Sequence, residues 1–234
     1  VNFKLLCANI IDRERGLAVA QPYCVLRRGN YRIGIIGVTT ETLPGETHPK
    51  VQDSVLAYPS PVVKGLASYL RGAGCDIVIA LTHQGYQRDL ALAKEVPDLD
   101  VIVGGHTHTK LEQPTRVGNV IVTQTNGWGR YLGVLRMTFE RDDKTKRFTL
   151  AQMANDYKAM SPDLPEDDGL KAFIADYDQR IKQEMSKVIA TSNQEFSVET
   201  VRTRENALAN MVADALRLQT GADIALFNGG NFRA

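Results

Sequence analysis

The sequence predicts an α/β fold, and two observations support that prediction. Between residues 61 and 103 the chain alternates helix, strand, helix and strand, which is the order of elements in α/β sheets. The first of these strands ends at His83 and the second ends just before His106. Because open α/β sheets bind ligands at the carboxyl ends of their strands, we expect the functional site at that edge.

The composition is that of an ordinary globular protein without a strong charge. The 234 residues suit one large domain or one domain plus part of another, and a 43% hydrophobic content supplies a sizeable core. The net charge of +1, from 28 basic and 27 acidic residues, creates no global field that would attract nucleic acid or an anionic membrane. No apolar run reaches the roughly 18 residues of a membrane span.

The three cysteines are predicted to be buried thiols. Cys7, Cys24 and Cys75 all lie in or beside apolar runs with strand character, and an odd number of cysteines cannot all pair. None of them has a C-x-x-C partner. We therefore favour burial over a disulfide or metal-binding role.

In the first half of the chain, the predicted elements build one sheet and its covering helices. Apolar runs bounded by turn residues predict strands over residues 3–11, 23–27, 31–39, 76–81 and 98–103. Apolar residues at helical spacing predict a helix over residues 61–72, which begins at Pro61, and another over residues 88–96. A polar loop with two prolines is predicted over residues 40–53.

In the second half the pattern changes to consecutive strands and then helices. A β-meander is predicted from the runs 119–125, 132–140 and 147–157. A long helix over residues 169–189 follows, with one apolar stripe made of Leu170, Phe173, Ile174, Tyr177, Ile181 and Met185. From residue 190 we predict a strand, a helix that contains Leu208 and Met211, and a short strand over residues 223–227.

Histidines at the predicted sheet edge suggest a metal site. His83, His106 and His108 all lie at or just after strand ends, and neutral imidazole is a common ligand of divalent metals. Gly104 and Gly105 permit a kinked turn that would point both rings of the H-x-H pair to one side. One such histidine alone would be read as an ordinary loop residue, but three at adjacent strand ends favour metal binding. His48, in the proline-containing loop, has no such context.

Several motifs, in the same order along the chain, resemble one enzyme family. LTHQG (residues 81–85) and DVIVGGHTHT (residues 100–109) resemble the second half of calcineurin-like metallophosphoesterases of the 5′-nucleotidase family. LCANI (residues 6–10), IGVTT (residues 36–40), and Gln124 with GRYLG (residues 129–133) resemble further strands of that family. REN (residues 204–206) and NGGNFR (residues 228–233) resemble the start of its C-terminal nucleotide-binding domain.

The resemblance covers nearly the whole chain and implies a fold and a domain order. It implies a metallophosphoesterase-type β-sandwich flanked by helices and incomplete at its N-terminus. Residues 1–160 would be the C-terminal part of the metallophosphatase domain, residues 161–189 a linker helix, and residues 190–234 the beginning of a second α/β domain that binds substrate.

The resemblance also implies the chemistry of the site. His83 and His106 match ligands of one divalent metal and His108 matches a ligand of a second, the ions being Zn, Mn, Mg or Ca. Such metals activate a hydroxide that attacks the phosphorus of a nucleotide phosphoester. Members of the family are typically exported, to the periplasm or the outside of the cell.

The resemblance further assigns nucleotide binding to the tail of the chain. Arg204, Asn228, Gly230 and Arg233 match residues of the nucleotide-binding motifs. Arginine suits anionic oxygens and can stack on a base. Without the family match, surface charge and turn chemistry would be the favoured explanation of these residues. Thr107 and Thr109 are expected to shape their turn and not to act in catalysis.

The sequence departs from the family pattern at its front. It contains no D-x-H motif and no Asn-His pair, whereas the family's D-x-H, G-D and G-N-H-[DE] motifs precede the strand that LCANI resembles. Those motifs supply the bridging Asp, most ligands of the second metal and the catalytic His, which is therefore expected upstream of Val1. We expect this chain to be part of a longer enzyme and to be inactive alone, because three histidines without a bridging carboxylate form at best a weak site.

Two other kinds of function fit the same motifs. Within the superfamily, 2′,3′-cyclic nucleotide phosphodiesterases and thiosulfohydrolases share the GGHTH turn or close variants of it. Outside enzymes, a binding protein could keep this fold without metals. A structural domain alone would not need three histidines at strand ends.

Overall fold

The computed structural model describes residues 2–48, 55–57, 59–144 and 147–232 of the chain. The chain divides into two compact units, residues 1–164 and 165–234. Each unit is considered by itself.

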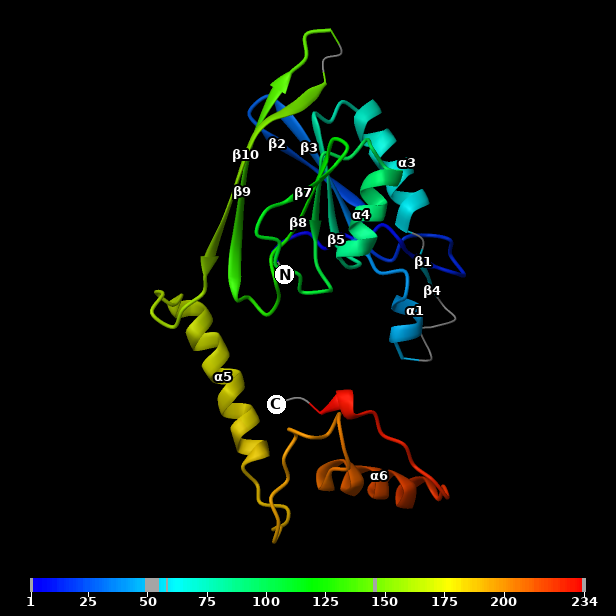
Figure 1. Ribbon diagram of the computed structural model, residues 1–234, viewed down its shortest axis with the longest axis vertical. Coiled ribbons are helices and arrows are strands. Elements are labelled where there is room, and N and C mark those ends of the chain that lie inside the picture. Colours follow the sequence, from blue (N-terminus) through cyan, green and yellow to red (C-terminus); the bar gives the residue numbers. More distant parts are fainter. Residues whose placement is uncertain (1, 49–54, 58, 145–146, 233–234) are drawn as a thin grey trace. The chain divides into compact units, whose positions relative to one another are not determined.

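The first unit is built on a six-stranded sheet that is mostly parallel (Figure 1). The strand order is β2-β3-β5-β6-β8-β7, in which β3, β5, β6 and β8 are parallel and the edge strands β2 and β7 are antiparallel to their neighbours. The strands are β2 (Tyr23–Arg28), β3 (Tyr31–Thr39), β5 (Ile77–His83), β6 (Val101–Gly104), β7 (Thr115–Val117) and β8 (Val120–Gln124). The predicted alternation of strands and helices is confirmed, although β7 was not predicted.

Two helices, α3 (Pro59–Gly72) and α4 (Tyr86–Glu95), cover one face of this sheet (Figure 1). Their apolar sides join inward-facing residues of the strands in one core. Its members include Val63, Leu70, Val78, Leu92, Ile102 and Val122, each at most 1% exposed. Both predicted helices are confirmed, and burial of this apolar surface, at about 25 cal/mol per Å², is the main stabilising contribution.

The strands β9 (Tyr131–Arg141) and β10 (Phe148–Ala159) form a separate hairpin on the other side of the sheet from α3 and α4 (Figure 1). The predicted β-meander is therefore wrong, since β8 pairs with β6 and β7 and not with β9. The reason lies in burial. All five residues of β8 are buried, as in a central strand, whereas β9 and β10 are largely exposed. The ring of Tyr31 lies 5.5 Å from that of Phe148, which connects the hairpin to the sheet.

The first segment of the chain hydrogen-bonds to the sheet but forms only an isolated bridge there, between Leu6 and Gln21. The predicted strand over residues 3–11 is reduced to β1 (Ile10–Asp12), which pairs with β4 (Val55–Ala57). The backbone of Leu6 passes so close to Gly37 that a Cβ there would lie 2.3 Å from the Leu6 carbonyl oxygen. Glycine therefore permits this close approach. The short helix α1 (Leu43–Glu46) lies within the predicted loop, and residues 49–53 of that loop lie outside the described residues.

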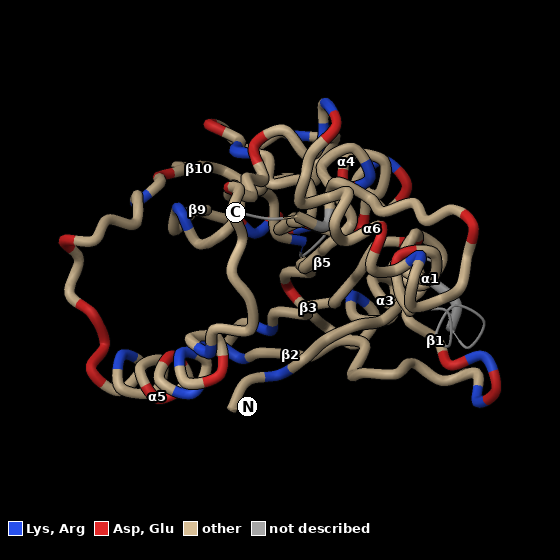
Figure 2. The backbone as a smooth tube through the Cα atoms, turned by 90° about the horizontal axis from the view of Figure 1, so that it is seen from below, with Lys and Arg blue, Asp and Glu red and all other residues tan. Residues whose placement is uncertain are grey.

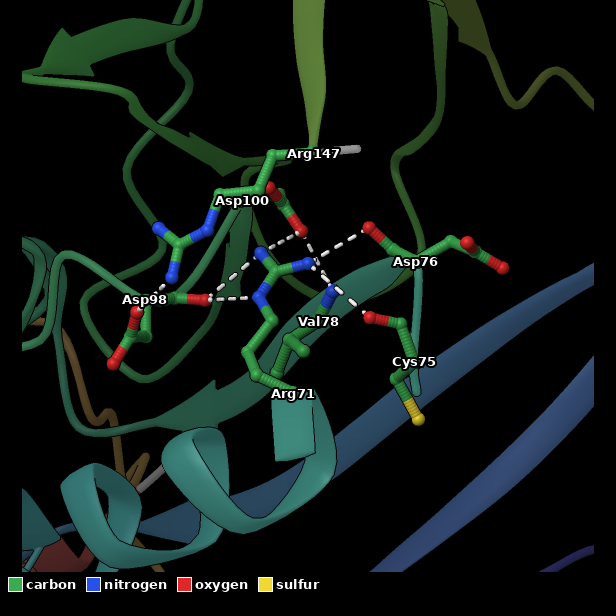
Figure 3. Close-up of polar contacts among 7 residues, drawn as sticks. All are labelled: Arg71, Cys75, Asp76, Val78, Asp98, Asp100 and Arg147. Atoms are coloured by element: carbon green, nitrogen blue, oxygen red, sulfur yellow. Dashed lines mark hydrogen bonds and ion pairs between the residues drawn. The ribbon is translucent and has the colours of Figure 1, made fainter. Parts of the chain in front are cut away.

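The side chain of Arg71, in the last turn of α3, ties that helix to the amino ends of β5 and β6 (Figure 3). Its guanidinium donates to the carbonyl oxygens of Asp98 (3.0 and 2.9 Å) and Asp76 (2.7 Å), and it contacts Asp100 Oδ2 at 2.6 Å. Asp100 in turn accepts the backbone N–H of Val78. Burial raises the pKa of the Asp100 carboxyl group, and the charge of Arg71 opposes that rise.

The second unit contains the helices α5 (Asp168–Met185) and α6 (Ala207–Thr220) and a 3-10 turn, η1 (Gly229–Asn231). Both helices are confirmed, although α5 ends four residues before its predicted end at residue 189. The side chains of Asp167 and Asn206 accept backbone N–H groups of the first turns and so cap the two helices. Lys and Arg alternate with Asp and Glu along α5 (Figure 2), and Arg180 pairs with Asp176 at 2.7 Å.

The two strands predicted for the second unit are wrong. Residues 190–206 and 223–227 form no strand in the described structure. A strand is stable only when a neighbour satisfies its backbone N–H and C=O groups, and residues 165–232 offer no such neighbour. The apolar run of residues 223–227 therefore has no neighbouring strand to pair with in the described structure.

The prediction that the cysteines are buried is confirmed for two of the three. Cys24 and Cys75 are buried, Cys7 is half-buried, and all three are free thiols. Among the described residues, no helix is both long enough and apolar enough to cross a membrane.

Candidate metal centre

Two of the three candidate histidines meet at the carboxyl edge of the sheet. His83 is the last residue of β5, and His106 follows β6 after the two glycines. The strands are parallel neighbours, and the two imidazole rings lie edge to face with centroids 5.2 Å apart. Gly105 makes this approach possible, since a Cβ on it would lie 3.1 Å from Nδ1 of His83. Both histidines are exposed and therefore accessible to a ligand.

His108 is held by a different neighbour. Its ring contacts the indole of Trp128, with centroids 4.3 Å apart, and Gly127 lies directly beside it. A Cβ on Gly127 would lie 2.6 Å from two carbon atoms of the imidazole. The guanidinium of Arg130 lies 4.7 Å from the Trp128 ring, which is itself 72% exposed. The loop after β8 therefore fixes His108 from one side.

The turn that carries both histidines is strained. His106 and His108 adopt positive φ angles of 78° and 53°, which are unfavourable for residues with a Cβ. Strain of this kind persists only where the surroundings hold the backbone in place. Such positions cluster at functional sites.

Gln124, at the end of β8, fixes this turn through hydrogen bonds of its side chain. Gln124 is only 1% exposed. Its Nε2 donates a hydrogen bond to the Gly105 carbonyl oxygen at 2.7 Å. Its Oε1 accepts hydrogen bonds from the Thr107 hydroxyl, at 3.0 Å, and from the backbone N–H of Thr109. The Thr107 hydroxyl also accepts the backbone N–H of Tyr86. The Thr107 hydroxyl therefore shapes the turn as predicted, and Thr109 contributes its backbone N–H.

A buried carboxylate on α4 was not predicted to belong to the site. Asp89 is fully buried, and its Oδ1 accepts the Thr82 hydroxyl at 2.7 Å and the Gln84 amide at 2.9 Å. Burial raises the pKa of its carboxyl group, and the two hydrogen bonds offset part of that rise. A signal was present in the sequence, because Asp89 shares the helical face of the buried Leu92, Ala93 and Val96.

The raised pKa of Asp89 predicts a pH dependence of stability. The folded chain holds the proton more tightly than the unfolded chain, whose carboxyl titrates near about 3.9. The stability that Asp89 contributes is therefore complete below the unfolded pKa and is lost as pH rises through the folded pKa. In urea unfolding from about pH 4 to about pH 8, the original chain should lose stability relative to Asp89→Asn. A difference between the two that stays constant with pH would contradict this.

The nucleotide-binding candidates lie in the second unit. Asn228 accepts the backbone N–H of Gly230 at 2.9 Å and so builds the turn that they share. Gly229 lets that turn pack against the segment before Arg204, because a Cβ there would lie 2.5 Å from the Val201 carbonyl oxygen. The structure thus places the turn of Asn228 and Gly230 beside the turn that ends at Arg204. Arg233 lies outside the described residues.

The imidazoles fit part of a metal centre. His83 and His106 bring two imidazole rings close together, and imidazole is a common ligand of zinc and other transition metals. Within the described part of the chain, no three His, Cys, Asp or Glu side chains gather closely enough to hold a metal ion. A complete site would need ligands beyond these histidines. The catalytic histidine expected upstream of Val1 stays a prediction, and Val1 itself lies outside the described residues.

Comparison with known proteins agrees with this picture. Residues 188–234 match the family described as the 5′-nucleotidase C-terminal domain. The trifunctional nucleotide phosphoesterase protein YfkN of Bacillus subtilis is 30% identical over 237 residues, which cover 94% of this chain and 16% of YfkN. The crystal structure of the 5′-nucleotidase precursor from Thermus thermophilus superposes with a TM-score of 0.74 at 30% identity, covering 99% of this chain and 50% of that one.

A further structure shows the same fold at lower identity. The calcineurin-like phosphoesterase YfkN of Bacillus subtilis superposes with a TM-score of 0.67 at 18% identity, covering 80% of this chain and 65% of that chain. The α/β fold is therefore that of the calcineurin-like phosphoesterases, as predicted. Within that class, the chain is similar to 5′-nucleotidases, and it spans 16% of the length of the YfkN protein and 50% of that of the Thermus thermophilus 5′-nucleotidase precursor. These relatives are hydrolases, and their family depends on divalent metals.

Proposed function

We propose that this chain is part of an enzyme that hydrolyses nucleotide phosphoesters in the manner of a 5′-nucleotidase. The observation that carries the proposal is the pair His83 and His106, whose rings lie edge to face, with centroids 5.2 Å apart, at the ends of adjacent parallel strands. Buried polar groups hold the turns of both residues, as a preformed site requires. The domain order 1–160, 161–189 and 190–234 belongs to this proposal, and so does export to the periplasm or the cell exterior.

In this proposal each candidate site residue has a stated role. His83 and His106 would hold one divalent ion and His108 a second, as Zn, Mn, Mg or Ca. The metals would activate the attacking water and neutralise charge on the phosphoryl oxygens. Arg204, Asn228, Gly230 and Arg233 would bind the nucleotide, with the arginines on its anionic groups. This chain alone is expected to be inactive, because the ligands it lacks would come from the rest of the enzyme.

Phosphate release from AMP by the longer enzyme, with Mn²⁺ or Zn²⁺ added, tests the proposal. His106→Ala should lower kcat/KM by about 100-fold or more, because loss of a direct ligand costs at least as much as loss of a supporting residue. The matched control is His48→Ala, which should leave activity unchanged. Unchanged activity in His106→Ala would contradict the assignment.

A comparison of substrates in the same experiment distinguishes a 5′-nucleotidase from a cyclic phosphodiesterase and from a binding protein. AMP and 2′,3′-cyclic AMP should be compared side by side, together with a metal analysis of the purified enzyme. Turnover of the cyclic ester alone would favour a cyclic phosphodiesterase. Absence of bound metal and of turnover would favour a binding protein on the same fold.

A further inference from the structure

A single buried carboxyl group lies beneath the turns of both histidines. Asp89 stands in the first turn of α4, which begins three residues after His83. Its side chain is fully buried, and its Oδ2 has no hydrogen-bond partner in the described structure. Burying a carboxyl group is unfavourable, and packing alone would be served better by an apolar side chain of similar size. The cost points to a role beyond packing.

One oxygen of this group holds the first histidine turn. Asp89 Oδ1 accepts from Thr82 at 2.7 Å and from Gln84 at 2.9 Å, the residues directly before and after His83. Both of these side chains are themselves buried. The backbone on either side of His83 is therefore fixed to one point on α4.

The other oxygen lies against the second histidine turn. A Cβ built on Gly104 would lie 2.2 Å from Asp89 Oδ2 and 3.2 Å from the Gln124 amide nitrogen. Gly104 comes two residues before His106, and Gln124 holds the next residue, Gly105, through its carbonyl oxygen. The Asp89 carboxyl and the Gln124 amide thus both support the backbone that leads to His106.

We propose that Asp89 is a positioning residue that sets the placement of His83 relative to His106. It touches neither imidazole, but it joins the turn on each side to the same helix. The relevance of Asp89 to metal binding and turnover rests on the proposed function, whereas its effect on the placement of the imidazoles does not. The raised pKa of Asp89 agrees with this arrangement, since a carboxyl group kept here against its desolvation is typical of functional sites.

The test uses imidazole resonances of the metal-free chain, which contains only four histidines. Asp89→Leu removes both oxygen atoms at similar shape, and nitrogen–proton correlation spectra should then show the His83 and His106 resonances displaced, with His48 unmoved. The matched control is Asp100→Leu. It alters another largely buried carboxylate, bound to Arg71 and Val78 at the opposite ends of β5 and β6. This control should lower stability and leave all four imidazoles unmoved.

Two outcomes would overturn the proposal. One is an Asp89→Leu spectrum identical to that of the original chain. The other is equal displacement in Asp89→Leu and Asp100→Leu, which would show a general loss of stability and no local effect. If Asp89→Leu does not fold, Thr82→Val removes one of the two bonds at nearly constant shape and should displace His83 more than His106.

A second measurement links the position of the imidazoles to binding. Titration of the longer enzyme with Co²⁺ alone should show affinity reduced by about 10- to 100-fold in Asp89→Leu and unchanged in Asp100→Leu. Displaced imidazoles with unchanged Co²⁺ affinity would uphold the positioning role and contradict the metal assignment. The two proposals can therefore fail separately.

Discussion

Arg71→Met is expected to lower the free energy of unfolding by about 3–5 kcal/mol, the range found when one partner of a buried ion pair is removed. The variant leaves Asp100 buried without its cation, and it leaves the Asp98 and Asp76 carbonyls without their donor (Figure 3). The Arg71 and Asp100 side chains are only 20% and 13% exposed, so water cannot replace these contacts fully. Urea unfolding, followed by circular dichroism, measures the change.

The double variant Arg71→Met with Asp100→Asn provides the control. It removes the buried charge as well as its partner, so it should recover part of the lost stability. A loss below about 1 kcal/mol in the single variant would show that the pair behaves like an exposed salt bridge. Equal losses in the single and double variants would contradict the unpaired carboxylate as the cause.

Gly104→Ala is expected to lower the free energy of unfolding by about 3 kcal/mol, at the upper end of the usual cost of overpacking. Its Cβ would lie 2.2 Å from Asp89 Oδ2, well inside van der Waals contact. Asp89 cannot move aside without breaking its bonds to Thr82 and Gln84. In the longer enzyme, activity should fall as well, because the same movement displaces the turn of His83.

Gly65→Ala is the matched control for this substitution. Gly65 lies in α3, and no atom lies within 4 Å of a Cβ built there. Alanine favours a helix over glycine by up to about 1 kcal/mol, so this variant should be slightly more stable than the original chain. A loss in Gly104→Ala no larger than about 1 kcal/mol would mean that the turn adjusts readily.

Much of the sheet was predictable because its signals are local. The strand β3 spans residues 31–39 as predicted, since an apolar run between turn residues marks a buried strand. The meeting of His83 and His106 follows from the helix between β5 and β6, which makes parallel neighbours with their carboxyl ends at one edge. The sequence between residues 61 and 103 was therefore sufficient to predict both the fold class and the location of the candidate site.

The rest depends on contacts that the sequence does not display. The backbone at Leu6 packs closely against Gly37 and forms only an isolated bridge, and a strand pattern gives no sign of such a close approach. The apolar run over residues 223–227 has strand composition but no partner in the described structure. Asp89 resembles a surface residue until its neighbours on the helix face are counted. Burial and pairing are tertiary properties, and they override local propensity.

The left-handed backbone at His106 and His108 has a consequence for directed evolution. Each costs about 1 kcal/mol or more relative to glycine, which adopts this conformation freely. A library selected for heat resistance alone should therefore drift towards glycine at both positions and discard the imidazoles. A library selected for turnover should retain them. At these two positions, selection for activity and selection for thermal stability therefore favour different residues.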